Sequence, residues 1–117
     1  MEYKGSCHCG QVKFVIEGKL SQALSCNCSI CQKKGSLLWC LPSQQVKVTL
    51  EKSDILETYT FNKHMINHHF CKNCGIHPYA QGTDAEGNSI FAINVRCIDD
   101  IDLDKIKINY FDGRSVQ

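Results

Sequence analysis

Cysteine is the residue whose number and spacing in this sequence point most directly to chemistry. There are nine cysteines in 117 residues, and seven of them lie in three short groups. Nine is an odd number and the N-terminal sequence lacks the layout of a secretion signal, so we favour metal ligands over a disulfide framework. The groups are Cys7 and Cys9; Cys26, Cys28 and Cys31; and Cys71 and Cys74, while Cys40 and Cys97 stand alone.

The first and third groups are predicted to form one structural zinc site. Zinc binds thiolates at about 2.3 Å and a structural site takes four ligands at tetrahedral corners, so the backbone has to turn sharply between neighbouring ligands. Gly10 and Gly75 directly follow cysteines of these two groups, and glycine accepts the positive φ that such turns require. Pairing part of the middle group with the first is an alternative, because sequence does not fix connectivity. The predicted ligands are Cys7, Cys9, Cys71 and Cys74.

The middle group offers three thiolates within six residues, which is typical of a zinc with an open fourth position. Such a zinc binds a substrate thiol as thiolate or lowers the pKa of a bound water. Three thiolates leave it with a negative net charge, which favours holding a thiolate over strong activation of water. The alternative is a site closed by a distant fourth ligand, with Cys40, Cys97, His68, His69 and His77 as candidates. Cys26, Cys28 and Cys31 are therefore predicted both as metal ligands and as catalytic residues.

The segments that must hold these groups are predicted to be β-strands, because their apolar residues alternate with a period of two. Residues 37–41 are wholly apolar between turn signals, which predicts a strand buried on both faces. Residues 99–107 fit a short helix with an aspartate cap and a strand almost equally well, and Asp112-Gly113 indicates a turn after a strand. The fold class is therefore all-β, a small antiparallel domain clipped by zinc, with strands at residues 11–17, 37–41, 45–50, 55–61 and 89–95.

Length and charge exclude several classes of protein. A chain of 117 residues is one domain's worth, so we expect a single zinc-binding domain over residues 1–117. Thirteen Lys and Arg against twelve Asp and Glu give a net charge of +1 without a block of like charges, which argues against a nucleic-acid partner. No apolar run approaches the roughly 18 residues of a membrane-spanning helix. We expect a cytoplasmic protein without a membrane partner.

Four stretches of the sequence resemble the family of glutathione-dependent formaldehyde-activating enzymes, which also includes centromere protein V. They are residues 5–14 (GSCHCGQVKF), 26–35 (CNCSICQKKG), 70–79 (FCKNCGIHPY), and 94–99 (NVRCID) followed by 111–113 (FDG). The resemblance implies a small β-tent fold with two zinc ions, one structural and one held by the middle cysteine group at the active site. It also implies that a thiol, glutathione in the family's named activity, and an aldehyde, formaldehyde, are joined to S-hydroxymethylglutathione. The reverse cleavage would make the protein a carbon–sulfur lyase.

Arg96 is the predicted catalytic residue outside the cysteines, because a guanidinium steadies an oxyanion or binds a carboxylate; a surface arginine beside a strand is the alternative. His77 is a candidate proton donor, with a structural role in its turn favoured. His68 and His69 are adjacent in an expected strand, so at most one of them faces a given site. A second class of function is a non-catalytic zinc-stabilised binding or scaffolding module, whose second site would be closed by four protein ligands.

Overall fold

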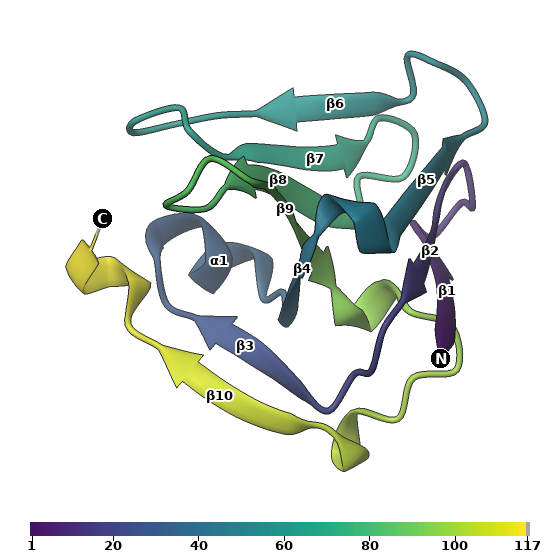
Figure 1. The fold of residues 1–117 in the computed structure, drawn as a ribbon. Coiled ribbons are helices and arrows are strands. Elements are labelled where there is room, and N and C mark those ends of the chain that lie inside the picture. The colour runs from purple at the N-terminus through teal and green to yellow at the C-terminus, as the bar shows by residue number, and fades with distance from the viewer. Residues whose placement is uncertain (117) are drawn as a thin grey trace.

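The computed structural model describes residues 1–116, which form ten β-strands, one short α-helix and four 3-10 turns (Figure 1). The helical elements are α1 (Ser29–Lys34), η1 (Ser43–Gln45), η2 (Val95–Cys97), η3 (Leu103–Lys105) and η4 (Gly113–Val116). The strands are β1 (Glu2–Ser6), β2 (Val12–Glu17), β3 (Gln22–Cys26), β4 (Leu38–Pro42), β5 (Val46–Leu50), β6 (Leu56–Tyr59), β7 (Asn67–Cys71), β8 (Tyr79–Thr83), β9 (Ser89–Asn94) and β10 (Lys107–Phe111).

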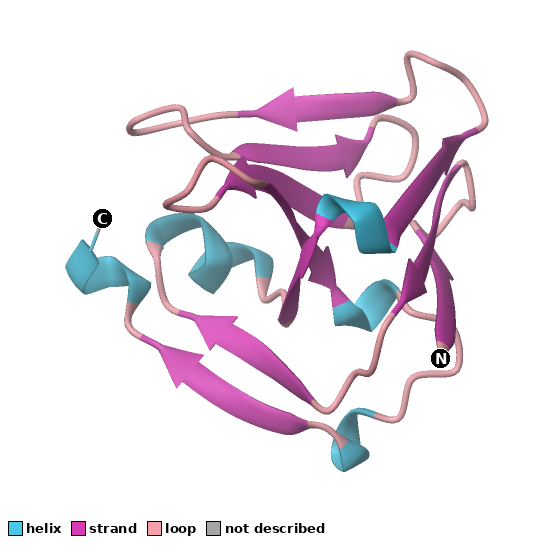
Figure 2. Ribbon diagram, viewed as in Figure 1, coloured by secondary structure: helices cyan, strands magenta, loops and turns pink. Residues whose placement is uncertain are grey.

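The strands form two sheets, which Figure 2 shows as the dominant structure of the molecule. One has the order β1-β2-β5 and the other the order β10-β3-β4-β9-β8-β7-β6. Neighbouring strands are antiparallel, as the sequence predicts, except that β10 runs parallel to β3 and places Phe111 opposite Cys26. Strands β4 to β9 lie between these two strands in the sequence, so no hairpin sets their direction. The all-β fold class is confirmed, with this one parallel pair.

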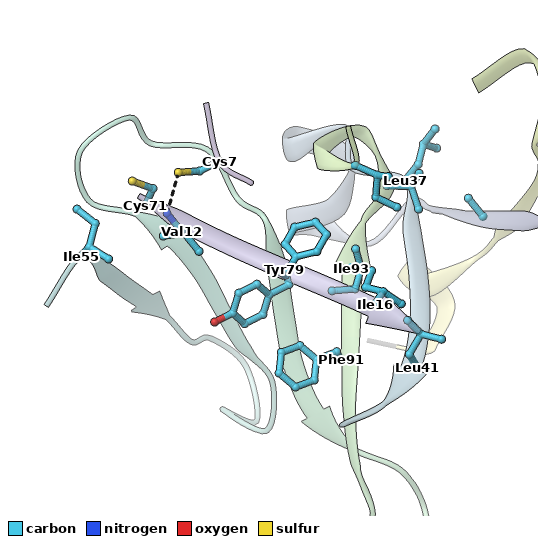
Figure 3. Close-up of a cluster of buried hydrophobic side chains, with 14 residues drawn as sticks. Cys7, Val12, Ile16, Leu37, Leu41, Ile55, Cys71, Tyr79, Phe91 and Ile93 are labelled. Atoms are coloured by element: carbon cyan, nitrogen blue, oxygen red, sulfur yellow. Dashed lines mark hydrogen bonds between the residues drawn. The ribbon is translucent and has the colours of Figure 1, made fainter. Parts of the chain in front are cut away.

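The two sheets share one hydrophobic core (Figure 3). The inward face of β2 contributes Phe14 and Ile16, which contact a cluster that includes Tyr79 of β8 and Ile93 of β9. Burying each of these large side chains stabilises the fold by about 1.5–3 kcal/mol. Cys7 and Cys71 belong to the same cluster, so two predicted metal ligands lie at the edge of the packed core. The core therefore holds these two side chains in fixed positions.

The five predicted strands are all present, as β2, β4, β5, β6 and β9. The prediction that residues 37–41 are buried on both faces is wrong, because Leu41 is the buried residue of β4 while Cys40 is exposed. Trp39 is half-buried and packs edge-on against Tyr3, with 5.5 Å between ring centroids. A wholly apolar strand thus has one face directed to the core and one directed outward.

Helical structure is scarce and short. In residues 99–107 the aspartate cap is real but serves a single 3-10 turn: Asp102 Oδ1 accepts a hydrogen bond from the backbone N–H of Asp104 at 3.1 Å, and β10 begins directly afterwards. The longest helix among residues 1–116 is α1, with six residues. No helix in this part of the chain is long and apolar enough to cross a membrane.

Candidate metal centres and the adjoining pocket

Four cysteine sulfurs from distant parts of the chain come together in one cluster, the four-cysteine cluster. The Sγ atoms of Cys7 and Cys9 are 3.6 Å apart, as are those of Cys9 and Cys71. Four sulfurs at about 2.3 Å from a tetrahedral metal lie about 3.8 Å from one another, whereas a disulfide bond is about 2.05 Å long. The spacing is therefore that of a metal site. Its members, whose sulfurs all lie within 4.8 Å of one another, are Cys7, Cys9, Cys71 and Cys74.

Two tight turns position these sulfurs. Gly10, at φ 83°, donates its backbone N–H to the carbonyl of Cys7 at 3.2 Å, and Gly75, at φ 78°, donates to the carbonyl of Cys71 at 2.8 Å. Left-handed φ values of this kind favour glycine, as the sequence predicts. The backbone N–H of Val12 also donates to the Sγ of Cys7 at 3.4 Å (Figure 3). This hydrogen bond helps to fix the position of the Cys7 sulfur.

The cysteines of this cluster differ in acidity. Hydrogen bonds, the largest contribution coming from the Asn73 side chain, lower the pKa of Cys9 to about 6. Burial raises the pKa of Cys71 to about 11, because its thiolate loses contact with water. One thiol is therefore readily ionised while another is held neutral. A divalent cation resolves this difference, because it deprotonates the thiols that it binds.

The second cluster, the three-cysteine cluster, lies where β3 ends and α1 begins. Cys26 is the last residue of β3, Cys28 is the extended N-cap of α1, and Cys31 is buried within the helix. Their sulfurs all lie within 4.8 Å of one another, and the backbone N–H of Cys28 donates to the Sγ of Cys26 at 3.4 Å. Within residues 1–116, no further Cys, His, Asp or Glu side chain joins this group. The distant candidates for a fourth ligand stay outside it.

Acidity is uneven in the three-cysteine cluster as well. Burial, followed by the neighbouring Cys28, raises the pKa of Cys31 to about 12. For Cys28, burial opposes ionisation, but hydrogen bonds from the backbone and side chain of Cys31 outweigh it and lower the pKa. Lys34 lies near both, and burial lowers the pKa of its ammonium group. The cluster thus presents one acidic thiol at a helix start and one held neutral beneath it.

A pocket of about 640 Å³ opens beside the three-cysteine cluster. This volume lies within the range of small-molecule sites. Arg96 reaches the pocket from η2, where the Asn94 side chain accepts a hydrogen bond from its backbone N–H at 3.2 Å. The structure therefore brings the predicted arginine to the same hollow as two of the three cysteines. Lining residues that matter for the argument are Cys26, Asn27, Cys31, Arg96, Phe111 and Asp112.

Comparison with known proteins identifies this arrangement of motifs. The sequence model of the family described as glutathione-dependent formaldehyde-activating enzyme matches residues 2–111. The chain belongs to this family. The match confirms the resemblance that the four cysteine-containing stretches indicate, and it includes all seven clustered cysteines together with Arg96.

The fold of this family member is similar to that of a protein from Rhodobacter sphaeroides, whose crystal structure was determined as a structural-genomics target. The two sequences are 25% identical and the structures superimpose with a TM-score of 0.76. The alignment covers 91% of this chain and 99% of the Rhodobacter chain. The similarity therefore extends over the whole domain and is not limited to the cysteine motifs.

The histidines that the sequence singles out lie near the clusters without joining them. His68 and His69 point to opposite faces of β7, as adjacent strand residues must. His69 is bonded through Nδ1 to the Thr58 hydroxyl and through Nε2 to the Gln81 carbonyl oxygen, each at 2.8 Å. The Nδ1 atoms of His68 and His77 are buried without a hydrogen-bond partner. Burial, then the Lys34 charge, lowers the pKa of His68 to about 4, so it is neutral at pH 7.

Sequence reasoning missed the role of two polar pocket residues, Asn27 and Gln32. Asn27 lies between two of the clustered cysteines and bonds to the Asp112 carboxylate, with 3.0 Å between Nδ2 and Oδ1. Gln32 bonds to the Arg114 guanidinium. The signal that could have identified them is their position in the sequence, because Asn27 lies between Cys26 and Cys28 and Gln32 directly follows Cys31. Their partners lie more than eighty residues away in sequence, which no local pattern indicates.

Proposed function

We propose that the protein forms or cleaves the bond between a small-molecule thiol and an aldehyde, as a carbon–sulfur lyase whose active site is the three-cysteine cluster with zinc. The observation that carries this proposal is that two cysteines of the three-cysteine cluster, Cys26 and Cys31, line a pocket that Arg96 also lines. Membership of the family makes glutathione and formaldehyde the substrates to test first. The product would be S-hydroxymethylglutathione.

Zinc at the four-cysteine cluster would be structural. Four thiolate donors complete a tetrahedral coordination sphere, and soft sulfur ligands suit zinc. The cluster joins the turn between β1 and β2 to the end of β7, so the metal would link segments 62 residues apart. Its contribution would be to the stability of the fold.

Zinc bound to Cys26, Cys28 and Cys31 would supply a position at which a substrate thiol is held as thiolate. In the forward direction the sulfur forms a bond to the carbonyl carbon, the π electrons of the carbonyl move to oxygen, and that oxygen takes up the proton the thiol gave up. Arg96 places a permanent positive charge in the pocket, where it would bind a substrate carboxylate or steady the developing oxyanion. Cleavage is the same sequence reversed.

The competing function is a zinc-stabilised binding or scaffolding module without turnover. That reading requires the second cluster to be closed by a fourth protein ligand. Among residues 1–116 no Cys, His, Asp or Glu supplies one, which supports the enzyme. A pocket beside the three sulfurs, with room for a small molecule, supports it as well.

The test is a titration of the cobalt-substituted protein with glutathione, because the absorption of Co²⁺ reports its sulfur ligands. We expect two metals per chain and a spectral change for one of them. S-methylglutathione, which has no thiol, should produce none. Exchange of formaldehyde with glutathione, followed by NMR, then measures the reaction itself. Two bound metals of which neither responds to any thiol would overturn the proposal.

Variants at Arg96 test whether this residue contributes to substrate binding in the pocket. Arg96→Gln is expected to raise the glutathione concentration needed for half of the spectral change by about tenfold, because a charged hydrogen bond contributes roughly 1.5–3 kcal/mol. Lys13→Gln removes the same charge from an exposed position of β2 outside the pocket and is the matched control. Equal titration curves for the two variants would show that Arg96 does not contribute to glutathione binding.

A further inference from the structure

Gly113 lies directly against the three-cysteine cluster. A Cβ atom at this position would be 2.5 Å from the Sγ of Cys26 and 3.0 Å from the Cβ of Cys28. Carbon and sulfur atoms do not approach so closely without one of them moving. Gly113 is itself buried, at the start of η4. The absence of a side chain therefore allows the backbone from the C-terminal part of the chain to lie on the sulfur of Cys26.

Hydrogen bonds hold this part of the chain in place. Asn27 donates its backbone N–H to the carbonyl of Phe111 at 3.2 Å and its Nδ2 to the Asp112 carboxylate at 3.0 Å. Its Oδ1 accepts from the backbone N–H of Arg114, also at 3.0 Å. One residue between two cysteines thus makes three bonds to residues 111–114. Figure 1 shows the corresponding contact, with the turn after β10 beside the connection from β3 to α1.

The same contacts continue the pairing of β10 with β3. Phe111 lies opposite Cys26 in the parallel register, so the closing segment, defined as residues 111–116, extends the strand pair past the point where β3 ends. The guanidinium of Arg114 bonds to Gln32 on α1, which ties the segment to the other side of the cluster. Phe111 and Asp112 also line the pocket. The segment contacts the β3 end, the loop and the helix that carry the three sulfurs.

We propose that the closing segment is a clamp that fixes the three-cysteine cluster in its binding geometry, with Gly113 as the positioning residue that allows it to close. The inference rests on the proposed function, because it assumes that this cluster binds a metal. Cys26 is the ligand most affected, since it has the segment on one side and the pocket on the other. The clamp leaves the pocket side as the approach for a substrate thiol.

The test compares Gly113→Ala with Gly82→Ala in the metal-loaded protein. A Cβ at Gly82 meets its nearest neighbour at an ordinary 3.6 Å, so this variant is the matched control. Groups that hold metal ligands in place typically change metal affinity by about 10- to 100-fold. We expect Gly113→Ala to weaken metal binding at the three-cysteine cluster by this factor, measured by competition with a chelator, and to alter its cobalt spectrum. The metal of the four-cysteine cluster should be retained.

Asp112→Ala removes the hydrogen bond between Asp112 and Asn27 without adding an atom near the sulfurs. It is the alternative test variant if Gly113→Ala does not fold. We expect Asp112→Ala, like Gly113→Ala, to weaken metal binding at the three-cysteine cluster in the chelator competition. If both variants bind the second metal as the wild type and Gly82→Ala do, the clamp is refuted while the proposed function stands. If the wild type binds two metals and neither responds to a thiol, the proposed function fails. The clamp is then supported or refuted by the metal affinity of Gly113→Ala compared with that of Gly82→Ala.

Discussion

Replacing Cys71 and Cys74 together should destabilise the whole domain, because the metal that we propose at the four-cysteine cluster would close a large loop. The contact between Cys9 and Cys71 joins residues 62 positions apart. By the chain-entropy relation for a cross-link, closing a loop of this length stabilises the fold by about 4 kcal/mol. A domain of this size has a total stability of about 5–15 kcal/mol. The double variant Cys71→Ser/Cys74→Ser therefore loses a large share of it.

The matched control is the double variant Cys26→Ser/Cys28→Ser, which also removes two thiolates. Its cluster spans six residues, for which the same relation yields about 2 kcal/mol. With a urea m-value of about 2 kcal/mol/M, the unfolding midpoints should fall by roughly 2 M for the first variant and by 1 M or less for the second. The assay is urea unfolding of each protein with zinc in excess. Equal shifts for the two variants, or no shift for the first, would refute the reasoning.

Further perturbations of the metal clusters, the histidines and the core have defined outcomes. A chelator should remove the metal of the three-cysteine cluster first, since it has one protein ligand fewer, and simultaneous loss of both metals would contradict this. His68→Phe should preserve or raise the free energy of unfolding, because it removes a buried unpartnered nitrogen, whereas His69→Phe breaks two hydrogen bonds and should lower it by roughly 1–3 kcal/mol. Burial lowers the folded pKa of His68 from 6.5 to about 4. As the pH falls from 6.5 toward 4, the unfolded chain therefore binds a proton at this residue that the folded protein does not, and the free energy of unfolding declines. Urea midpoints of the wild type should decline more steeply in this range than those of His68→Phe. Gly5→Ala should lower the melting temperature, because its Cβ would overlap the buried Phe14 ring, and an unchanged melting temperature would argue against that overlap.

The cysteine groups could be read from the sequence because each one is local. Two thiolates one or two positions apart, next to a glycine, define half of a metal site without any tertiary information. The pairing of the first and third groups followed from the count of four ligands, and the structure brings those sulfurs together. Strands with a regular alternation, such as β2, were predictable for the same reason: the pattern lies within a few consecutive residues.

Strands without that alternation were only partly predictable. A strand was expected at His68 and His69, where the structure has β7 (NHHFC), but none was predicted for β8 (YAQGT). A buried polar side chain breaks the apolar pattern, and only its partners on neighbouring strands explain its burial. His69 is the clearest case, since its ring is bonded on both sides by Thr58 and Gln81. The parallel pairing of β3 and β10 was equally inaccessible, because nothing local links residues so far apart in sequence. Asp112-Gly113 was predicted only as a turn, and its contact with Cys26 depends on that pairing.

The pairing of β3 with β10 can form only after nearly the whole chain has been synthesised, because β10 lies close to the C-terminal end of this sequence. Asn27 is bonded to Asp112, 85 residues later. At a synthesis rate of about 5–20 residues per second, this interval lasts about 4 to 17 s. Throughout it, the three thiols of the loop exist on a nascent chain that has not yet produced the segment that packs against them. Oxidants have their best access to these thiols during this interval. We therefore expect the metal loading that we propose for this cluster to depend on the reducing power and the zinc supply at the site of translation.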